Sequence, residues 1–474
     1  MSYLNILSNN DILRVYDASI KILEETGVIF RSEEARDIFK QHGAKVVGET
    51  VYITNKMVEN CIETCPSTFK QYGIDEVNSV LIGDKQKQLV VSTQNGSVYI
   101  QDLDEGRRKG TVEDYVNITK LCQASDVLSV VGGIPLEPLD LDPNGRHLQI
   151  MYHLLKHTDK PLLGVNGTQK EVREMFDMIE ITVGKKDYLL DHPVIGIAPN
   201  PLSPLKYDTE PLETIIAYAK HRQPVYINAC IMAGTTGPIN LLGTVTQMNT
   251  EILAGLVLIQ LINPGSPVVY VSGSTVSNMK NGNFVTGSPE SILIAVAGIQ
   301  IARQLYHIPT RAMAGCTDAK DVDCQAGYET MQNLLMTVLA GVHFINNGIG
   351  CLDSIMTTSY EKFMIDQELI KRVIRLTDGI DTSDKALSVD VIQEVAHSGG
   401  YMMHQNTFEH FRERWQPSIS CWDSYENWAR SDSRDIIVRA NQMYKEILDN
   451  SPKSLLNLEV ERDLRRYMDK ILNP

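Results

Sequence analysis

The stretch GCTDAKDVDCQAGYE, at residues 315–329, contains two cysteines, four carboxylates and a glutamine. Thiolates and carboxylates bind metal ions, a thiolate can act as a nucleophile, and carboxylates cap helices. The stretch follows the apolar run 308–314 and precedes a helix that we expect from Gln325 onward. It is therefore a candidate metal site, a candidate nucleophile site, or a loop that caps the next helix.

Other chemical motifs are sparse. HExxH, GxSxG, a Walker loop and GxGxxG after a strand are all absent from the sequence. The two cysteines of residues 315–329, Cys316 and Cys324, lie eight residues apart, a spacing with no natural metal geometry. Buried cysteine is the more ordinary expectation, so we predict no metal site. A zinc site built from Cys230, Cys316, Cys351 and His343 stays open as an alternative.

The middle of the chain alternates between short apolar runs and helix-like segments, and this rhythm is typical of βα units. Eight runs have Gly, Asn, Pro or Ser at or next to their last position: residues 89–96, 127–135, 161–168, 193–201, 224–234, 266–274, 308–316 and 341–350. Helices are expected between them at 112–125, 146–157, 169–183, 209–221, 241–261, 289–306, 325–340 and 360–375. Eight alternations predict an α/β fold, a (β/α)8 TIM barrel.

The flanks have a different character. We predict a mainly helical N-terminal extension over residues 1–85, the barrel over 86–375, and a helical C-terminal extension over 376–474. The C-terminal flank carries all three tryptophans, at 415, 422 and 428. We expect the flanks to pack on the barrel or to form contacts in a homo-oligomer.

Composition excludes several classes of protein. The formal net charge is −15, and an acidic chain repels phosphate backbones, so we expect no nucleic-acid partner. The start of the chain lacks the basic and apolar regions of a signal peptide, and the apolar runs 252–262 and 292–301 are too short to span a bilayer. Eight scattered cysteines do not resemble a disulfide framework. We therefore expect a reduced, cytoplasmic protein with no membrane contact.

In a barrel of this type the reaction takes place at the carboxyl ends of the strands. The residues that follow the apolar runs are mostly amides, glycines and hydroxyls, and only one histidine, His343, is expected at a strand end. None of the eight runs contains a lysine that could form a Schiff base. Single asparagines usually satisfy turns, but four amides on one rim favour a binding site.

Three late segments carry a family resemblance. Residues 315–329, then GVHFINNGIGCLDS from 341 and TTSYEKFMIDQEL at 357–369, resemble the trimethylamine methyltransferase family of the MttB type. LNILSNNDILRVYDASIKILEETGV, at 4–28, matches the family's opening helix. The resemblance covers most of the chain. It implies a TIM barrel that passes a methyl group from a methylamine to cobalt(I) of a partner corrinoid protein, with no tightly bound cofactor of its own.

This chain departs from the family's founding members, which carry pyrrolysine in the barrel, because it contains only standard residues. Members without pyrrolysine resemble demethylases of quaternary amines: glycine betaine, proline betaine, carnitine or γ-butyrobetaine. A quaternary nitrogen has no lone pair, so neither a general acid nor zinc can activate it. The protein need only bind, orient and desolvate the substrate. A rim poor in His and Lys agrees with such a reaction.

The resemblance and the strand-end rule together give candidate site residues. We expect His343 and Asp318 as the catalytic side chains. Aromatic faces attract a quaternary ammonium, and donors hold a carboxylate. The expected substrate-binding residues are Tyr99, Asn166, Asn228, Ser272, Gln325, Tyr328, Phe344 and Glu361. Arg311 could also hold the carboxylate, although strand alternation is expected to point it outward.

Two rival interpretations remain at this point. One is a zinc-dependent corrinoid methyltransferase with another methyl donor, which would use the cysteine and histidine set named above. The other is a betaine-binding protein without catalysis, which the absence of a signal peptide disfavours.

Overall fold

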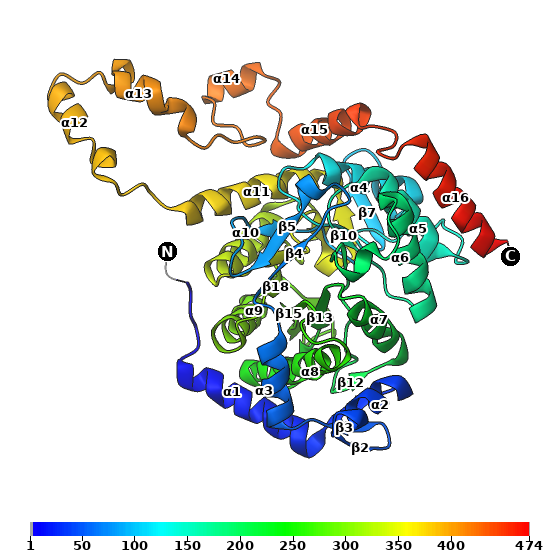
Figure 1. Cartoon of the computed structure of the whole chain (residues 1–474). Helices are drawn as coiled ribbons and strands as arrows, with labels where there is room; N and C mark the ends of the chain where they lie inside the picture. The colour runs from blue at the N-terminus through cyan, green and yellow to red at the C-terminus, as the bar shows by residue number, and fades with distance from the viewer. Residues whose placement is uncertain (1–2, 474) are drawn as a thin grey trace.

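Eight short parallel strands run through the middle of the computed structural model, which describes residues 3–473 (Figure 1). They form a three-stranded sheet, β11-β10-β9, and a five-stranded sheet, β13-β15-β18-β19-β6. Two single bridges join these sheets, Ser92 to Val130 and Ile197 to Val225, both parallel. The strands are β6 (Val90–Val91), β9 (Val131–Gly132), β10 (Leu162–Leu163), β11 (Ile195–Gly196), β13 (Val225–Ala229), β15 (Val268–Ser272), β18 (Thr310–Met313) and β19 (Phe344–Asn346).

A helix follows each of these strands, so the mixed α/β fold predicted from the sequence is confirmed. The helices are α4 (Val112–Ala124), α5 (Arg146–His157), α6 (Gln169–Val183), α7 (Thr209–Lys220), α8 (Leu241–Ile262), α9 (Pro289–Ile301), α10 (Cys324–Leu339) and α11 (Tyr360–Asp378). Their starts follow local capping rules: Thr111 and Thr168 form capping boxes, and Ser288 caps α9 ahead of Pro289.

Helix α8 is longer than the apolar run at 252–262 indicates. It has 22 residues and is long and apolar enough to cross a membrane by length and composition alone. However, 78% of its apolar window is buried inside the protein. Its apolarity on every side is therefore explained by its place between the central strands and the N-terminal elements.

The N-terminal elements pack on the outside of α8. They comprise α1 (Asn9–Lys21), β1 (Val28–Phe30), α2 (Glu33–Gln41), β2 (Lys45–Val47), β3 (Thr50–Tyr52) and α3 (Asn55–Thr64). Strand β1 also pairs in parallel with β12 (Lys206–Tyr207). Within this mainly helical extension, β2 and β3 pair as an antiparallel hairpin.

A hairpin, β4 (Thr68–Gln71) and β5 (Val80–Gly83), closes the amino ends of the central strands. The Gln71 amide donates to the carbonyls of Leu162 and Val194, where β10 and β11 begin. Phe69 and Ile82 pack against Tyr226 and Phe344 in an apolar cluster separate from the main core. The interior of the central strands is therefore filled at its amino end.

Short strands and hairpins surround the opposite, carboxyl ends. They are β7 (Tyr99–Asp102) with β8 (Gly106–Lys109), β20 (Cys351–Leu352) with β21 (Thr357–Ser359), and β14 (Met232–Ala233), β16 (Thr275–Ser277) and β17 (Phe284–Val285). The alternating pattern at 86–375 gave no indication of them, because each belongs to a loop after a central strand.

The C-terminal part consists of short helices followed by two long ones. These are α12 (Val389–Val395), α13 (Gln405–His410), α14 (Tyr425–Arg430), α15 (Ile436–Asn450) and α16 (Leu458–Leu472). Helix α15 packs on α11, and α16 packs on α6. Helices α12 and α13, by contrast, lie in an arm that projects from the body (Figure 1).

Candidate active site

One row of side chains crosses five neighbouring strands at the same level. The register pairs Asn228 with Val271, Val271 with Arg311, Arg311 with Phe344, and Phe344 with Val90. Residues side by side in a sheet point to the same face. Phe344, Val271 and Val90 belong to the apolar cluster inside the strands, so the whole row faces the interior.

Arg311 is the unusual member of this interior row. Only 2% of its surface is exposed, and its guanidinium carbon lies 5.0 Å from the centroid of the Tyr226 ring and 4.7 Å from that of the Phe344 ring. The described residues give it no carboxylate partner within ion-pair distance, and its Nε is a buried donor without an acceptor. A buried charge without a counter-charge is costly, so this guanidinium is a candidate for binding an anion.

Two amide oxygens of the same interior also lack hydrogen-bond donors among the described residues, Oδ1 of Asn228 and Oδ1 of Asn346. The Asn228 amide donates to the Cys230 thiol at 3.1 Å, and the Asn346 amide donates to Oδ1 of Asn347 at 2.8 Å. Asn346 pairs in register with Met313, two residues nearer the carboxyl ends than the Arg311 row. The interior thus becomes polar towards its carboxyl end.

Burial determines the protonation states in this interior. It lowers the pKa of Arg311 to about 10, against the opposing effects of Tyr226 and Cys230, so the guanidinium stays charged at neutral pH. Burial raises the pKa of the Cys230 thiol to about 11, with the Asn228 hydrogen bond acting against it. Cys230 is therefore a neutral thiol and not an activated nucleophile.

Below the row, Tyr226 is fixed by a hydrogen bond from its hydroxyl to Oε1 of Gln71, at 2.5 Å. Its ring also makes an edge contact with Phe344, with the centroids 5.5 Å apart. Tyr226, which lies on the amino-end side of Arg311, is consequently held in place by the β4–β5 hairpin.

The structure places Asn228 and Phe344, both predicted from the sequence, in the same interior row as Arg311. The expectation that Arg311 points outward is wrong, because its register partner Phe344 faces the interior. Sequence reasoning gave Cys230 and Asn346 no part in substrate binding. The signal that could have found the site was an arginine inside an otherwise apolar run.

His343 does not lie at the carboxyl end of a strand, and that prediction is wrong. It precedes Phe344, the first residue of β19, and so lies at the amino end. Its Nδ1 contacts the backbone nitrogen of Thr310 at 3.1 Å, and its Nε2 lies 3.5 Å from Oδ1 of Asp84. Burial lowers its pKa, although Asp84 acts in the opposite direction. His343 is thus a buried histidine packed at the amino end of the strands, away from the carboxyl ends.

The loop at 315–329 is braced by its own carboxylates. Asp318 accepts hydrogen bonds from the backbone of Thr286 and Gly287 and from the hydroxyl of Ser354. Glu329 accepts from Asp318 N at 2.8 Å. Asp323 caps α10, as the helix-cap interpretation of this loop expects. Both carboxylate oxygens of Asp318 therefore accept hydrogen bonds that hold the loop together, and neither is free to act in catalysis.

The remaining predicted residues lie apart from the interior row. Gln325 donates to Glu329 at 2.9 Å, and Tyr328, on α10, is 60% exposed. Asn166 follows β10 and is exposed. Tyr99 starts β7, where the Arg107 guanidinium carbon lies 3.6 Å from its ring centroid.

Ser272 ends β15 but faces the helices. It lies in register with Ala229 and Ala312, one residue beyond the interior row and therefore on the opposite face. A Cβ added at Gly298 of α9 would lie 2.2 Å from its Oγ. This placement separates Ser272 from Arg311.

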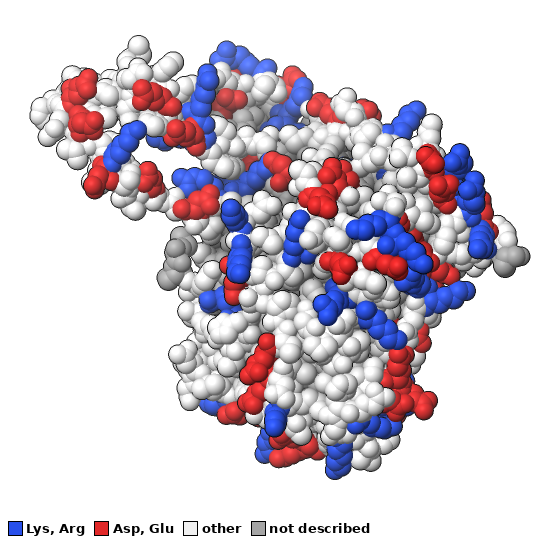
Figure 2. Space-filling view, in the orientation of Figure 1, with Lys and Arg blue, Asp and Glu red and all other residues white. Residues whose placement is uncertain are grey.

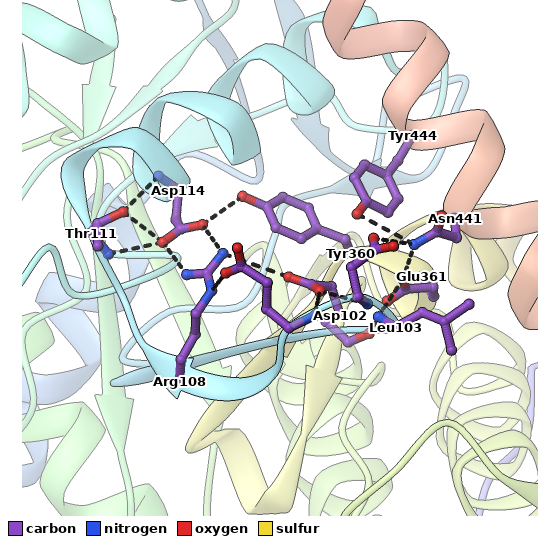
Figure 3. Close-up of polar contacts among 12 residues, drawn as sticks. Asp102, Leu103, Arg108, Thr111, Asp114, Tyr360, Glu361, Asn441 and Tyr444 are labelled. Atoms are coloured by element: carbon purple, nitrogen blue, oxygen red, sulfur yellow. Dashed lines mark hydrogen bonds and ion pairs between the residues drawn. The ribbon is translucent and has the colours of Figure 1, made fainter.

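Glu361 belongs to a polar cluster where α11, α15 and the β7–β8 hairpin meet (Figure 3). It accepts hydrogen bonds from Leu103 N at 3.0 Å and from the Asn441 amide at 2.9 Å. Nearby, Arg108 binds Asp114 through both terminal nitrogens, at 2.6 and 2.9 Å. Glu361 thus ties the C-terminal helix α15 to the body.

Within residues 3–473, no group of three or more His, Cys, Asp or Glu side chains is gathered where it could hold a metal ion. Cys316 and Cys351 contact each other, and this hydrogen bond together with burial raises the pKa of the Cys316 thiol well above its usual range. His343 lies at the other end of the strands, so the four residues of the zinc alternative do not converge.

Comparisons with known proteins agree along the whole chain. The family model described as trimethylamine methyltransferase (MTTB) matches residues 1–472. A glycine betaine methyltransferase of Desulfitobacterium hafniense (strain Y51) is 36% identical, over 98% of this chain and 96% of the relative. A proline betaine:corrinoid methyltransferase of Eubacterium limosum is 35% identical, over 87% and 86%. The crystal structure of the Methanosarcina barkeri monomethylamine methyltransferase (MtmB) has a similar fold, with a TM-score of 0.51 at 10% identity, over 94% of this chain and 93% of that one.

Proposed function

The chain belongs to the trimethylamine methyltransferase family, and from this premise we propose that it demethylates a quaternary amine and passes the methyl group to a corrinoid protein. The substrate is of the glycine betaine, proline betaine, carnitine or γ-butyrobetaine type. The observation that carries the proposal is the similarity, over nearly the full length, to relatives named for glycine betaine and proline betaine.

The chemistry of the interior supports this reaction. The carbon–nitrogen bond breaks, the nitrogen keeps the electron pair as a neutral tertiary amine, and the methyl carbon bonds to the acceptor, which supplies the new pair. This transfer needs no proton at the nitrogen, and the interior row offers no acid or base with a pKa near neutrality. The chain's contribution is to bind, orient and exclude water.

We also propose that the two parallel sheets act as one (β/α)8 barrel over residues 86–375, with extensions at 1–85 and 376–474. The parallel bridges at Ser92 and Ile197, which join the sheets at both edges, support this arrangement. The corrinoid protein then approaches the carboxyl ends, because the β4–β5 hairpin closes the amino ends. The corrinoid stays on the partner, and the chain itself binds no cofactor tightly.

A cytoplasmic location is part of the same proposal. The eight cysteines are all free, which suits a reducing compartment. We further propose a homo-oligomer, for which the projecting arm at residues 379–417 provides the support.

The arm exposes apolar surface that a second copy of the chain can cover. Ile380, Met402, Met403 and Phe408 are each at least 72% exposed, and nine large apolar side chains in all are exposed within the arm. Charges of both signs are scattered over the arm with uncharged surface between them (Figure 2). At roughly 100 Å² each, these side chains present on the order of 1,000 Å², which exceeds the ~800 Å² per partner of a standard interface. A corrinoid protein that binds and leaves in each cycle would not cover this surface permanently.

The proposed reaction is tested with purified protein, reduced cobalamin as acceptor and each of the four betaines. The absorbance of the corrinoid reports methylation, and chromatography identifies the tertiary amine. We expect turnover with at least one betaine and none with trimethylamine. Absence of transfer from every quaternary amine, with the cognate corrinoid protein also supplied, would refute the proposal. Activity that a chelator abolishes and zinc restores would favour the zinc-dependent alternative.

A further inference from the structure

We infer that Arg311 binds the substrate's carboxylate and so fixes both the chemical class and the orientation of the substrate. The inference deepens the proposed function and rests on it. Quaternary amines such as choline and tetramethylammonium carry the same reacting group but no carboxylate. The residue therefore selects zwitterionic betaines from quaternary amines in general.

The charge of Arg311 is isolated in the interior of the protein. Only 2% of the Arg311 surface is exposed, and its guanidinium faces aromatic rings and neutral groups. Nε of Arg311 has no acceptor among residues 3–473. Buried arginines are normally paired with carboxylates, so a guanidinium kept in this state is suited to an anion that arrives with a ligand.

The guanidinium of Arg311 is supported by neighbouring side chains. Tyr226 and Phe344 contact it from β13 and β19, and Gln71 holds the Tyr226 hydroxyl from the amino-end hairpin. The planar group is therefore held in place before a ligand binds, which lowers the entropy that binding costs. Tyr226 also occupies the space beside Gly196, where an added Cβ would lie 2.2 Å from its hydroxyl.

The position of this charge also sets the orientation in which a betaine binds. Positive charge at Arg311 attracts a carboxylate and repels a quaternary ammonium, so a betaine enters with its carboxylate inward. Its methyl groups then point towards the carboxyl ends of the strands, past Asn346 and Met313. That is the side from which the acceptor approaches in the proposed reaction. Unpartnered amide oxygens of Asn228 and Asn346 add partial negative charge that suits the ammonium end.

The test measures binding without any corrinoid. Isothermal titration calorimetry and ligand-induced shifts in melting temperature are recorded for glycine betaine, proline betaine, carnitine and γ-butyrobetaine, and for choline and tetramethylammonium. The variants are Arg311→Met, Arg311→Lys and a control, Arg303→Met. Arg303 makes a similar contact with the Tyr3 ring, 4.0 Å from its centroid, but lies on the helical exterior.

We expect at least one betaine to bind the wild-type protein and Arg303→Met equally, while choline and tetramethylammonium bind neither. Arg311→Met should weaken betaine binding at least thirtyfold, since removing one partner of a buried charge pair costs about 2–5 kcal/mol. Arg311→Lys should lie between the two. Without ligand, Arg311→Met should melt at the wild-type temperature or above it, because a methionine avoids the buried charge.

Three outcomes would overturn the inference. The first is betaine binding by Arg311→Met at wild-type affinity, and the second is equally tight binding of choline by the wild-type protein. The third is a ligand-free Arg311→Met that melts well below the wild type, which would assign Arg311 a structural role. Betaine binding that depends on Arg311 without any methyl transfer would instead refute the proposed function and leave this inference standing.

Discussion

At the scale of single residues, a glycine provides the space that the Asn228 side chain occupies in the interior row. Gly273 follows β15, and a Cβ added there would lie 1.9 Å from Oδ1 of Asn228 and 3.5 Å from the Cys230 sulfur. No real side chain tolerates the first distance. The position of the Asn228 amide therefore depends on the absence of a side chain at residue 273.

The first prediction follows from this contact. Gly273→Ala should displace the Asn228 side chain and reduce kcat/KM for the best betaine by about tenfold or more, while it lowers the free energy of unfolding by about 1–3 kcal/mol through overpacking. Steady-state kinetics and urea unfolding measure the two effects. The matched control is Gly327→Ala, in α10, where an added Cβ has no neighbour within 4 Å. That control should keep full activity and gain up to about 1 kcal/mol from helix propensity.

Equal activity of Gly273→Ala and Gly327→Ala would contradict the assignment of Asn228 to the site.

The positions of single residues are also where the predictions from the sequence failed. Strand side chains alternate with a period of two, so an error of one residue in a strand boundary exchanges interior and exterior. His343 was expected at the wrong end of β19, and Arg311 on the wrong face of β18.

At the scale of elements, one carboxylate on α11 fixes the end of the projecting arm. Glu368 is 3% exposed and accepts hydrogen bonds from the backbone nitrogens of Ser418, Ile419 and Ser420, at 2.8, 2.7 and 3.1 Å. It also binds Arg372 at 3.0 Å. Burial acts to raise the pKa of Glu368, but these donors outweigh it and hold the pKa at about 2.

This shift predicts a pH dependence of stability. The folded pKa lies below the ordinary value of 4.5, so the unfolded chain binds the proton more tightly. The stabilisation is then complete above pH 4.5 and is lost as the pH falls towards 2. Glu368→Gln should lose about 2–3 kcal/mol at pH 7, and its difference from the wild type should shrink over this interval. Urea unfolding as a function of pH measures the difference.

Amide hydrogen exchange at Ser418 to Ser420 should accelerate in Glu368→Gln at pH 7. Glu409→Gln, at an exposed carboxylate of the arm itself, is the matched control and should change neither measurement. A pH-independent difference between Glu368→Gln and the wild type would show that the charge of Glu368 does not hold the arm.

Elements differ in how well the sequence predicts them. Helices α4, α6 and α9 begin directly after their N-cap residues Thr111, Thr168 and Ser288. Such starts can be predicted from the sequence, because capping depends on neighbouring residues. Hairpins such as β7–β8 were missed, since strands of four residues are stabilised by tertiary partners such as β21 and not by their own pattern.

At the scale of the whole molecule, the arm at 379–417 is the feature that supports the proposed assembly of several copies. Its large apolar side chains are exposed to solvent in the single chain, and exposed apolar patches of this size mark interaction surfaces. The sequence indicated only helices and aromatic residues there. An interface between copies has no periodic signature in a single sequence, so the projection of the arm became visible only in the structure (Figure 1).

The last prediction tests that interface. Light scattering after size-exclusion chromatography should find the wild-type protein as a homo-oligomer at micromolar concentration. The double substitution Met403→Glu with Phe408→Glu places two charges on side chains that are 90% and 72% exposed in the single chain, so it should leave the fold intact. It should weaken association by at least about a hundredfold, because an unpaired charge buried in an interface costs several kcal/mol. Val77→Glu, at an apolar residue that is 82% exposed between β4 and β5, is the control and should assemble like the wild type. A monomeric wild-type protein, or a double variant that assembles normally, would show that a second copy does not cover the arm.

Because Arg311 lies among the central strands and far along the chain from the arm, the monomeric double variant should still bind its betaine. This result would separate assembly from substrate recognition.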